Sequence, residues 1–400
     1  MISELDKELV GDRPLLVYNE RLLEQMLSHL SQQSIVAIDT ESNSLFAYYP
    51  RVCLIQLSTP IEREQTQRHP LRVLDFLIDP LRLSVEQVAL IGRILFERNT
   101  EVVMHAAEND IILLQREFGF RFPHIFDTQL AARFLGWKQI GLAALLETHF
   151  NVISDKRMQR TNWGDRPLTP QQIAYAQMDT HYLLALRAMQ IEQLQSVNRW
   201  EATQDAFQRL SRLRAQDYVN GERNFWQMRI SREIDKACTG ILQALWEWRE
   251  GEAQRTNRPP FKVMNDEVLF QLASRQPVTL QELNDISGLG GHQVQRYGPV
   301  LLQVIRTGQK SPIPEEPEPA LSPEQLLDKA ARRRFDKLRT WRNEQAMQSD
   351  LAPELIFTNQ TLIEIAQTDP KNERELQQIP DVGAWKTQTY GHSLLSVLNR

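Results

Sequence analysis

The sequence predicts an α/β domain with a mixed β-sheet, followed by two smaller all-α domains. Three observations lead to this expectation. The first half of the 400-residue chain opens with short apolar runs and continues with alternating strand-like and helix-like patterns. The second half repeats itself at a constant offset, with apolar residues at helical spacing. A segment rich in proline and glutamate, residues 311–323, separates the two copies and is typical of a stiff, extended linker.

The first domain is expected to open with strands joined by short connections. An initial strand and an amphipathic helix over residues 20–30 are followed by three further apolar runs. The four expected strands cover residues 15–17, 35–38, 51–58 and 71–77. A polar connection over residues 62–69 joins the last two of them. Consecutive strands with such connections favour an antiparallel meander.

Strand and helix patterns alternate in the rest of this domain. A short strand is expected over residues 101–105, and another element begins at Ile125 and continues as a helix through Phe134. Thr169 suits the N-cap of the last helix, with Pro170 at its first position. The remaining helices are expected over residues 80–96, 108–118, 141–150 and 169–190. A meander followed by alternation predicts an α/β layer fold.

Two acidic residues, Asp39 and Glu41, lie at the end of the strand over residues 35–38. Because strand side chains alternate between faces, both carboxylates point the same way. Converging acids repel each other and are costly to bury unless a positive charge neutralises them. A divalent cation is one solution, since hard cations take oxygen ligands. The alternative is a strand that runs into a solvated loop.

Three more residues extend this pattern. Asp110 lies in the first turn of the helix over residues 108–118, directly after a strand. Tyr175 and Asp179 are four positions apart, so they are neighbours on one helix face. Taken singly, Asp179 fits a water-facing acid and Tyr175 fits an amphipathic core tyrosine. The ordered set of acids favours a metal site instead.

The composition is that of a globular protein without membrane segments. Hydrophobic residues make up 42% of the chain and charged residues 24%, and the formal net charge is −5. No apolar run approaches the roughly 20 residues that a membrane span needs, and the N-terminus lacks the pattern of a signal peptide. The two cysteines, Cys53 and Cys238, form neither a disulfide framework nor a zinc site. We therefore expect a cytoplasmic protein that is no bulk electrostatic binder of nucleic acid.

These residues resemble the three sequence motifs of the DEDD exonuclease superfamily, in its tyrosine-containing (DEDDy) branch. The motifs run from Ile38 to Glu41, from His105 to Asp110 and from Tyr175 to Asp179. Residues 156–159 and 163–168 resemble the segment that precedes the third motif in the bacterial ribonuclease D family. The resemblance covers about the first half of the chain, and no catalytic position is missing. It implies an RNase H-like fold and 3′→5′ exonuclease activity.

The resemblance also implies roles for the five catalytic candidates. Asp39 would bridge two divalent metal ions, Mg²⁺ or Mn²⁺, with Glu41 and Asp179 on the ion that binds the attacking water. Asp110 would lie on the side of the other ion. Tyr175 would orient the water, since an ordinary tyrosine pKa near 10 makes it a reluctant base.

Seven further residues are candidates for binding the substrate. Polar groups near the acids could hold the 3′ end of a nucleic acid: Thr40, Gln56, His105 and Asn109. Lys156 and Arg166 suit contacts to phosphate. Trp163 could stack on a base or simply pack in the core.

The repeat in the second half has an offset of 93 residues. Trp248-Arg249 recurs as Trp341-Arg342, and Tyr297-Gly298 recurs as Tyr390-Gly391. Each copy is expected to be a bundle of about five helices. The first copy resembles an HRDC domain, a helical module of RecQ helicases and ribonuclease D. The second copy looks degenerate, because Glu354 replaces Phe261. The expected divisions are 1–210 (exonuclease), 211–308 (first HRDC), 309–323 (linker) and 324–400 (second HRDC-like domain).

Together these features predict a metal-dependent 3′→5′ exoribonuclease that releases 5′-mononucleotides. By the resemblance, its substrates are structured RNAs with a single-stranded 3′ end, such as tRNA precursors. We expect a monomer, since nothing in the sequence indicates a coiled coil. Two alternatives stay open: a DNA exonuclease, because the motifs cannot distinguish the sugar, and a catalytically inactive nucleic-acid-binding scaffold.

Overall fold

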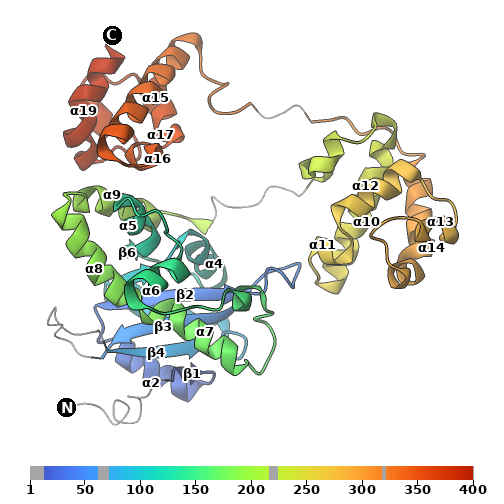
Figure 1. Cartoon of the computed structure of the whole chain (residues 1–400), viewed down its shortest axis with the longest axis horizontal. Helices are drawn as coiled ribbons and strands as arrows, with labels where there is room; N and C mark the ends of the chain where they lie inside the picture. Colours follow the sequence, from blue (N-terminus) through green and yellow to red (C-terminus); the bar gives the residue numbers. More distant parts are fainter. Residues whose placement is uncertain (1–12, 62–71, 216–223, 318–320, 400) are drawn as a thin grey trace. The chain divides into compact units, whose positions relative to one another are not determined.

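The computed structural model describes residues 13–61, 72–215, 224–317 and 321–399 (Figure 1). The chain forms two compact units. The first unit combines residues 1–42, 52–218 and 321–400, and the second combines residues 43–51 and 219–320. The predicted polar connection at residues 62–69 and the N-terminal segment that was compared with a signal peptide lie outside the described residues.

A six-stranded mixed sheet forms the centre of the first unit. Its strands lie in the order β1-β4-β3-β2-β5-β6. They cover Leu15–Val17 (β1), Ile35–Ser42 (β2), Val52–Pro60 (β3), Val73–Ile78 (β4), Glu101–Met104 (β5) and His124–Asp127 (β6). The strands β2, β3 and β4 pair antiparallel, which confirms the predicted meander. The pairs β1–β4, β2–β5 and β5–β6 are parallel.

Helices cover both faces of this sheet and bury its inner strands. All nine residues of β3 are buried. On one face, three helices pack against residues such as Ile38 and Leu57: α2 (Glu20–Leu30), α3 (Val85–Glu97) and α4 (Glu108–Phe118). On the other face, α7 (Pro170–His181) contacts β2, β3 and β4, and α8 (Leu183–Ser196) contacts β2 and β5. The polar residues of β3, Gln56, Ser58 and Thr59, are buried as well, and Ser58 donates a hydrogen bond to Asp75 at 2.6 Å.

The helices of this region follow the predicted order with two differences in their bounds. They cover Glu20–Leu30 (α2), Val85–Glu97 (α3), Glu108–Phe118 (α4), Thr128–Phe134 (α5), Leu142–Phe150 (α6), Pro170–His181 (α7), Leu183–Ser196 (α8) and Trp200–Ser211 (α9). The helix predicted from residue 80 begins at Val85, because Ser84 and Gln87 form a capping box there. The single helix predicted over 169–190 is two helices. At Tyr182 the backbone N–H bonds to Thr180, two residues back, which interrupts the helical ladder.

The two repeat copies are five-helix bundles, as predicted. The first copy, in the second unit, contains Thr239–Thr256 (α10), Pro260–Val263 (α11), Asp266–Arg275 (α12), Leu280–Asn284 (α13) and Gly291–Gly308 (α14). The second copy, in the first unit, contains Lys329–Ser349 (α15), Pro353–Ile356 (α16), Asn359–Thr368 (α17), Glu373–Gln377 (α18) and Ala384–Leu398 (α19). Short 3₁₀ turns between residues 225 and 238 precede α10.

A buried arginine has the same role in both copies. Arg249 Nη1 donates to the carbonyl of Met264 at 3.1 Å and to Asp266 Oδ1 at 2.6 Å. Arg342, 93 positions later, donates to the carbonyl of Phe357 at 2.9 Å and to Asn359 at 2.8 Å. A buried guanidinium is tolerated only when its N–H groups are paired. The repeat is therefore conserved in its internal hydrogen bonds as well as in its apolar positions.

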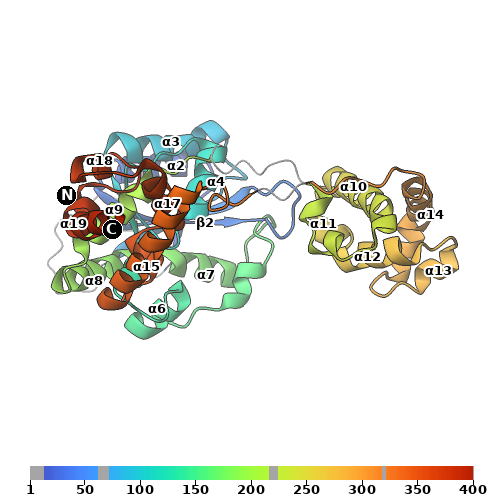
Figure 2. The ribbon, with the colours of Figure 1, turned by 90° about the horizontal axis from the view of Figure 1, so that it is seen from above.

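The second copy packs against the sheet-containing part of the first unit. Leu355 is buried in a cluster with residues of α5, α8 and α9, and Glu354 accepts a hydrogen bond from Arg133 at 2.6 Å. In the first copy these two positions are Lys262 and Phe261. The departures of the second copy from the HRDC pattern thus lie at its contact with the first domain. Figure 2 shows α19 next to α9, and these two helices are in contact.

A lysine is buried in that same contact. Lys386 is only 1% exposed. Its Nζ donates to the carbonyl of Asp381 at 3.2 Å and lies 3.8 Å from Asp205 Oδ2 on α9. Burial, together with the nearby Arg209, lowers the pKa of Lys386 to about 8, from an ordinary value of 10.5.

This lysine makes the stability of the first unit pH-dependent. The unfolded chain binds more protons than the folded chain between the two pKa values, so the Lys386 contribution to stability rises with pH from about 8 to about 10.5. We expect Lys386→Met to remove this rise and to increase the unfolding free energy near neutral pH by up to about 3 kcal/mol. Urea unfolding near pH 7 and near pH 10 checks this. Exposed Lys337→Met is the control, and equal pH slopes in the two variants would contradict the assignment.

Candidate active site

A cleft of about 720 Å³ lies at the carboxyl end of β2. Five of the predicted site residues line it together: Asp39, Glu41, His105, Tyr175 and Asp179. Thr40 and Lys156 complete the predicted residues on its wall. The cleft therefore brings together all three predicted sequence motifs, which lie up to 140 residues apart in the chain.

The strand β2 positions the first pair of acids. Asp39 lies opposite Gln56 of β3, Glu41 lies opposite Leu54, and the register shifts after Glu41. Both carboxylates thus point to the α7 face of the sheet, as the alternation of strand side chains predicts. Thr40 donates a hydrogen bond to Asp110 in the first turn of α4. This bond fixes the second motif beside the first.

A buried acid, Asp127, holds the turn that carries the second motif. Asp127 accepts backbone N–H groups of Ala106 at 3.2 Å and Ala107 at 2.9 Å. It also caps α5 through the N–H groups of Gln129 and Leu130. Ala106 has a positive φ of 56°, an unfavourable conformation for a non-glycine residue that these bonds help to maintain. Asp127 therefore holds the backbone of the second motif in place and does not itself line the cleft.

The third motif lies on α7, which begins with a capping box between Thr169 and Gln172. Tyr175 and Asp179 are both less than 10% exposed, and both face the cleft. The Tyr175 hydroxyl donates to the Asp179 carboxylate and accepts from Gln159. The hydroxyl is thus held at a defined position among the acids.

A buried polar network fixes the other side of α7. Asp75 of β4 accepts hydrogen bonds from Ser58 Oγ at 2.6 Å and Gln177 Nε2 at 2.7 Å, and lies 2.7 Å from His181 Nδ1. Ser58 Oγ also lies 2.7 Å from Thr180 Oγ1. Three residues of α7 are thereby tied to β3 and β4. The network sets how the helix presents Tyr175 and Asp179, so Asp75 is a positioning residue.

The Asp75→Asn variant tests this network. An amide has one oxygen in place of two, so at least one buried donor loses its acceptor, which costs about 1–3 kcal/mol. We expect a fall in unfolding free energy of that size and a several-fold fall in kcat, with KM little changed. Urea unfolding and steady-state kinetics check both effects. The exposed acid Glu192, changed to Gln, is the control. Lost stability with wild-type kcat would show that the network supports the fold alone.

Burial and mutual repulsion dominate the electrostatics of the cleft. Burial, followed by the charges of Asp110 and Asp179, raises the pKa of Asp39 well above its usual range. Burial, followed by the charges of Asp39 and Asp110, raises the pKa of Glu41 to about 9. Burial also raises the pKa of Asp110 to about 6, although the hydrogen bond from Thr40 partly offsets this effect. The pKa of Asp179 is also raised. Four acids that cannot all ionise together require a positive charge.

The donor set fits one kind of cation. Carboxylate oxygens are the preferred ligands of hard divalent ions. Asp179 Oδ2 is buried without a hydrogen-bond partner in the described part of the chain, as expected for a ligand atom. Among the described residues, no three His, Cys, Asp or Glu side chains are already clustered tightly enough to hold a metal.

Three predicted substrate contacts are wrong, because the structure buries or engages the side chains. Trp163 is completely buried, so it packs in the core and offers no surface to a base. Arg166 donates to both carboxylate oxygens of Asp79, at 2.6 and 2.9 Å, and to three backbone carbonyls, which leaves no donor for phosphate. Gln56 is fully buried in β3 and does not line the cleft.

The other four substrate candidates stay predictions. Thr40, His105 and Lys156 line the cleft, whereas Asn109, which belongs to the second motif, is exposed and does not line it. His105 Nδ1 lies 2.9 Å from Thr128 Oγ1, while its buried Nε2 has no partner among the described residues. Burial lowers the pKa of His105, which favours the neutral ring. Nε2 of the neutral His105 ring could form a hydrogen bond with a sugar hydroxyl.

Sequence reasoning missed part of the cleft wall. The lining residues that were not predicted are Gln129, Gln139, Gly141, Leu142, Ala143, Ala144, Ser154 and Gln159. Most belong to the loop before α6 and to its first turn. No charge pattern marks that segment, so only the order of elements could have placed it beside the motifs.

Comparison with known proteins agrees with this geometry. Residues 14–194 match the family described as 3′-5′ exonuclease, and residues 239–305 and 331–398 match the HRDC domain. Ribonuclease D of Zymomonas mobilis is 32% identical over 279 residues, which cover 69% of this chain and 67% of that protein. The chain belongs to the ribonuclease D family. As a member of that family it is a 3′→5′ exoribonuclease.

The relationship extends over the helical copies as well. Ribonuclease D of Musicola paradisiaca is 28% identical over 378 residues, 94% of this chain and 96% of that protein. The crystal structure of Escherichia coli RNase D shares the fold, with a TM-score of 0.60, 24% identity and coverage of 96% of this chain and 98% of that chain. The predicted fold class, an RNase H-like exonuclease domain followed by HRDC domains, is therefore confirmed.

Proposed function

We propose that this ribonuclease D relative trims structured RNAs with a single-stranded 3′ end, such as tRNA precursors, and releases 5′-mononucleotides. The observation that carries the proposal is the single cleft in which Asp39, Glu41, Tyr175 and Asp179 meet, with Asp110 next to it. We further propose a monomeric, cytoplasmic enzyme. In the described part of the chain, no helix is long and apolar enough to span a membrane.

Asp39, Glu41, Asp110 and Asp179 would hold two divalent ions, Mg²⁺ or Mn²⁺. When bound, such ions lower the pKa of a water molecule and stabilise the charge that develops on the leaving oxygen. The raised pKa values of the acids imply that they release protons as the ions bind. The carboxylates thereby become the anionic ligands that hard cations require.

The chain's own groups would orient the reactants. Burial raises the pKa of Tyr175, so its hydroxyl stays protonated and acts by positioning the attacking water through hydrogen bonds. His105 Nε2 and Thr40 would contact the terminal sugar, and Lys156 would contact phosphate. In this proposal a single strand would enter the active-site cleft, and a duplex would have to unpair before its 3′ end could do so.

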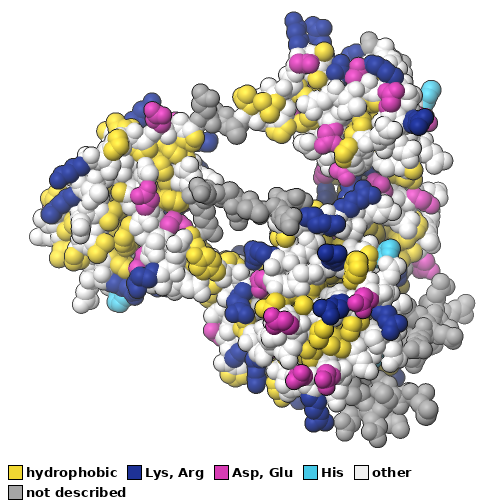
Figure 3. Space-filling view, turned by 180° about the vertical axis from the view of Figure 1, so that it is seen from behind, with side chains coloured by type: hydrophobic (Ala, Val, Ile, Leu, Met, Phe, Trp, Pro, Cys, Tyr) yellow, Lys and Arg dark blue, Asp and Glu magenta, His cyan; other side chains and the backbone are white. Residues whose placement is uncertain are grey.

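We also propose four segments for the chain: an exonuclease domain (1–210), a first HRDC domain (211–308), a linker (309–323) and a degenerate HRDC-like domain (324–400). Both HRDC domains would provide weak RNA contacts. On the face in Figure 3, basic and acidic side chains are interspersed and form no broad patch of one sign. Several weak contacts along a strand suit such a surface better than bulk attraction does.

A 5′-labelled RNA hairpin with a short single-stranded 3′ tail tests the proposal. We expect Mg²⁺ or Mn²⁺ to support shortening from the 3′ end, with a stall near the duplex and no reaction in EDTA. Thin-layer chromatography of the released label from a uniformly labelled RNA would identify 5′-mononucleotides. Faster degradation of the matching DNA would favour a DNA exonuclease. Binding without degradation of either would indicate an inactive scaffold.

A further inference from the structure

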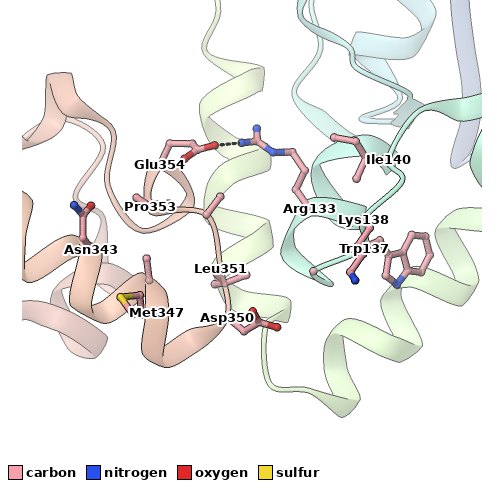
Figure 4. Close-up of a pocket in the computed structure, with 13 residues that line it drawn as sticks. Arg133, Trp137, Lys138, Ile140, Asn343, Met347, Asp350, Leu351, Pro353 and Glu354 are labelled. Carbon is pink, nitrogen blue, oxygen red and sulfur yellow. Dashed lines mark hydrogen bonds and ion pairs between the residues drawn. The ribbon is translucent and has the colours of Figure 1, made fainter.

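A second hollow, of about 600 Å³, lies between the loop that joins α5 to α6 and the C-terminal end of α15 (Figure 4). Both walls belong to the first unit. The loop contributes Trp137 and Lys138, and α15 contributes Asn343 and Met347. The Arg133–Glu354 ion pair lies across one end of it. The catalytic cleft contains none of these residues.

One loop separates this hollow from the active-site cleft. Gln139 and Gly141 line the cleft, whereas residues 136–138 and Ile140 line the hollow. The two cavities are therefore neighbours across a single segment of chain. An RNA strand with its 3′ end among the acids reaches the hollow as soon as it crosses this loop.

The side chains of the hollow suit a flat, partly polar ring. Trp137 is held by its backbone N–H, which donates to Ala132 at 3.0 Å, and by its ring, whose centroid lies 4.5 Å from that of His149. Met347 is 85% exposed, which is unusual for a large apolar side chain. Lys138 is exposed and has no ion-pair partner among the residues that the structure describes. Aromatic and thioether groups pack well on rings, and a nearby cation suits phosphate.

The repeat offers independent support. Asn343, Met347 and Asp350 of the hollow correspond, at the offset of 93, to Glu250, Gln254 and Asn257 of the first copy. In the second unit, Glu250, Gln254 and Asn257 all contact Tyr48, an aromatic residue of the same chain. The Tyr48 hydroxyl donates to Glu250 and accepts from Gln254, both at 3.1 Å.

The backbone of the same segment is bound as well. Asn257 Oδ1 accepts the N–H groups of Tyr48 at 3.1 Å and Tyr49 at 3.2 Å. This face of the repeat thus binds a ring with a polar edge in the first copy. In the second copy the equivalent face forms one wall of the hollow.

We propose that the hollow binds a nucleobase of the single-stranded RNA, upstream of the terminal nucleotide that enters the cleft. The base packs between Trp137 and Met347, Asn343 lies at its polar edge, and Lys138 contacts the adjacent phosphate. This inference rests on the proposed function. It gives the second HRDC-like copy a direct role in holding the substrate.

The test compares a dinucleotide, too short to reach the hollow, with a longer single-stranded oligomer. For Trp137→Ala and for Met347→Ala we expect the ratio of the oligomer KM to the dinucleotide KM to rise on the order of tenfold, the effect of losing one stacked base. Gln348→Ala is the matched control, because Gln348 is exposed on the same helix but does not line the hollow. Its ratio is expected to equal that of the wild type.

Three results would overturn the inference. An equal rise of both KM values would mean that Trp137 only supports the cleft wall. If the ratio of the two KM values were unchanged in both variants, the hollow would not bind an RNA base. An aromatic side chain of another protein would then be the remaining occupant. Binding measured in the Asp39→Asn background needs no turnover, so it separates this inference from the proposed function. If Trp137→Ala does not change the affinity for the oligomer in the Asp39→Asn background, this inference is refuted and the proposed function is unaffected.

Discussion

Asp39→Asn is expected to leave the chain folded and to lower kcat by roughly a thousandfold or more. A bound metal ion contributes several kcal/mol of transition-state stabilisation, and each 1.4 kcal/mol is about a factor of ten in rate. Asp39 is the acid whose loss affects both proposed ions. Without metal, the raised pKa of Asp39 means that this carboxylate must take up a proton when the chain folds, which costs free energy at neutral pH. Asparagine avoids this cost, so the metal-free variant is expected to be at least as stable as the wild type.

Single-turnover hydrolysis of a labelled RNA in saturating Mg²⁺, together with urea unfolding in EDTA, measures both effects. Glu24→Gln on α2, an exposed acid, is the control and is expected to behave as the wild type. If Asp39→Asn kept a rate near that of the wild type, the assignment of Asp39 as a shared ligand of two ions would have to be abandoned.

Tyr175→Phe is expected to slow turnover about a hundredfold and to leave RNA affinity nearly unchanged. The substitution removes only the hydroxyl, which donates to Asp179 and accepts from Gln159. Loss of a group that positions a reacting water has effects in the range of about 10²–10⁴ in rate. The ring itself stays packed against Trp163, at a centroid distance of 6.1 Å, so the fold is expected to be unaffected.

Separate measurement of kcat and of RNA binding distinguishes the possible roles of Tyr175. The control is Tyr18→Phe, a tyrosine that is 39% exposed on the same unit. Weaker RNA binding with wild-type turnover would make Tyr175 a substrate-binding residue and would leave the orientation of water to another group.

The sequence predicted those features that depend on local pattern. Alternation along β2 placed Asp39 and Glu41 on one face, and the four-residue spacing placed Tyr175 beside Asp179, because both periods are fixed by backbone geometry. The offset of 93 predicted two similar bundles, since equal spacing of apolar positions gives equal packing. The structure agrees with each of these expectations.

Features that depend on distant partners were missed or wrongly predicted. Arg166 looked available for phosphate, but Asp79, 87 positions earlier, engages its guanidinium. Trp163 has no sequence signal that separates a buried indole from a stacking one. The break at Tyr182 is equally invisible, because tyrosine is compatible with a helix. In each case the deciding contact comes from an element that the local sequence does not specify.

The first unit is built from both ends of the described chain, with the second unit inserted between its parts. This arrangement has a consequence for synthesis on the ribosome. The sheet and the helices α2 to α9 emerge well before residues 321–400, so the surface that receives Leu355 and Lys386 stays uncovered while the intervening residues are made. At about 5–20 residues per second, synthesis of the residues between α9 and residue 321 takes roughly five to twenty seconds. During that time the nascent exonuclease domain exposes apolar surface that only the last helices will cover, and chaperones have their opportunity to bind there.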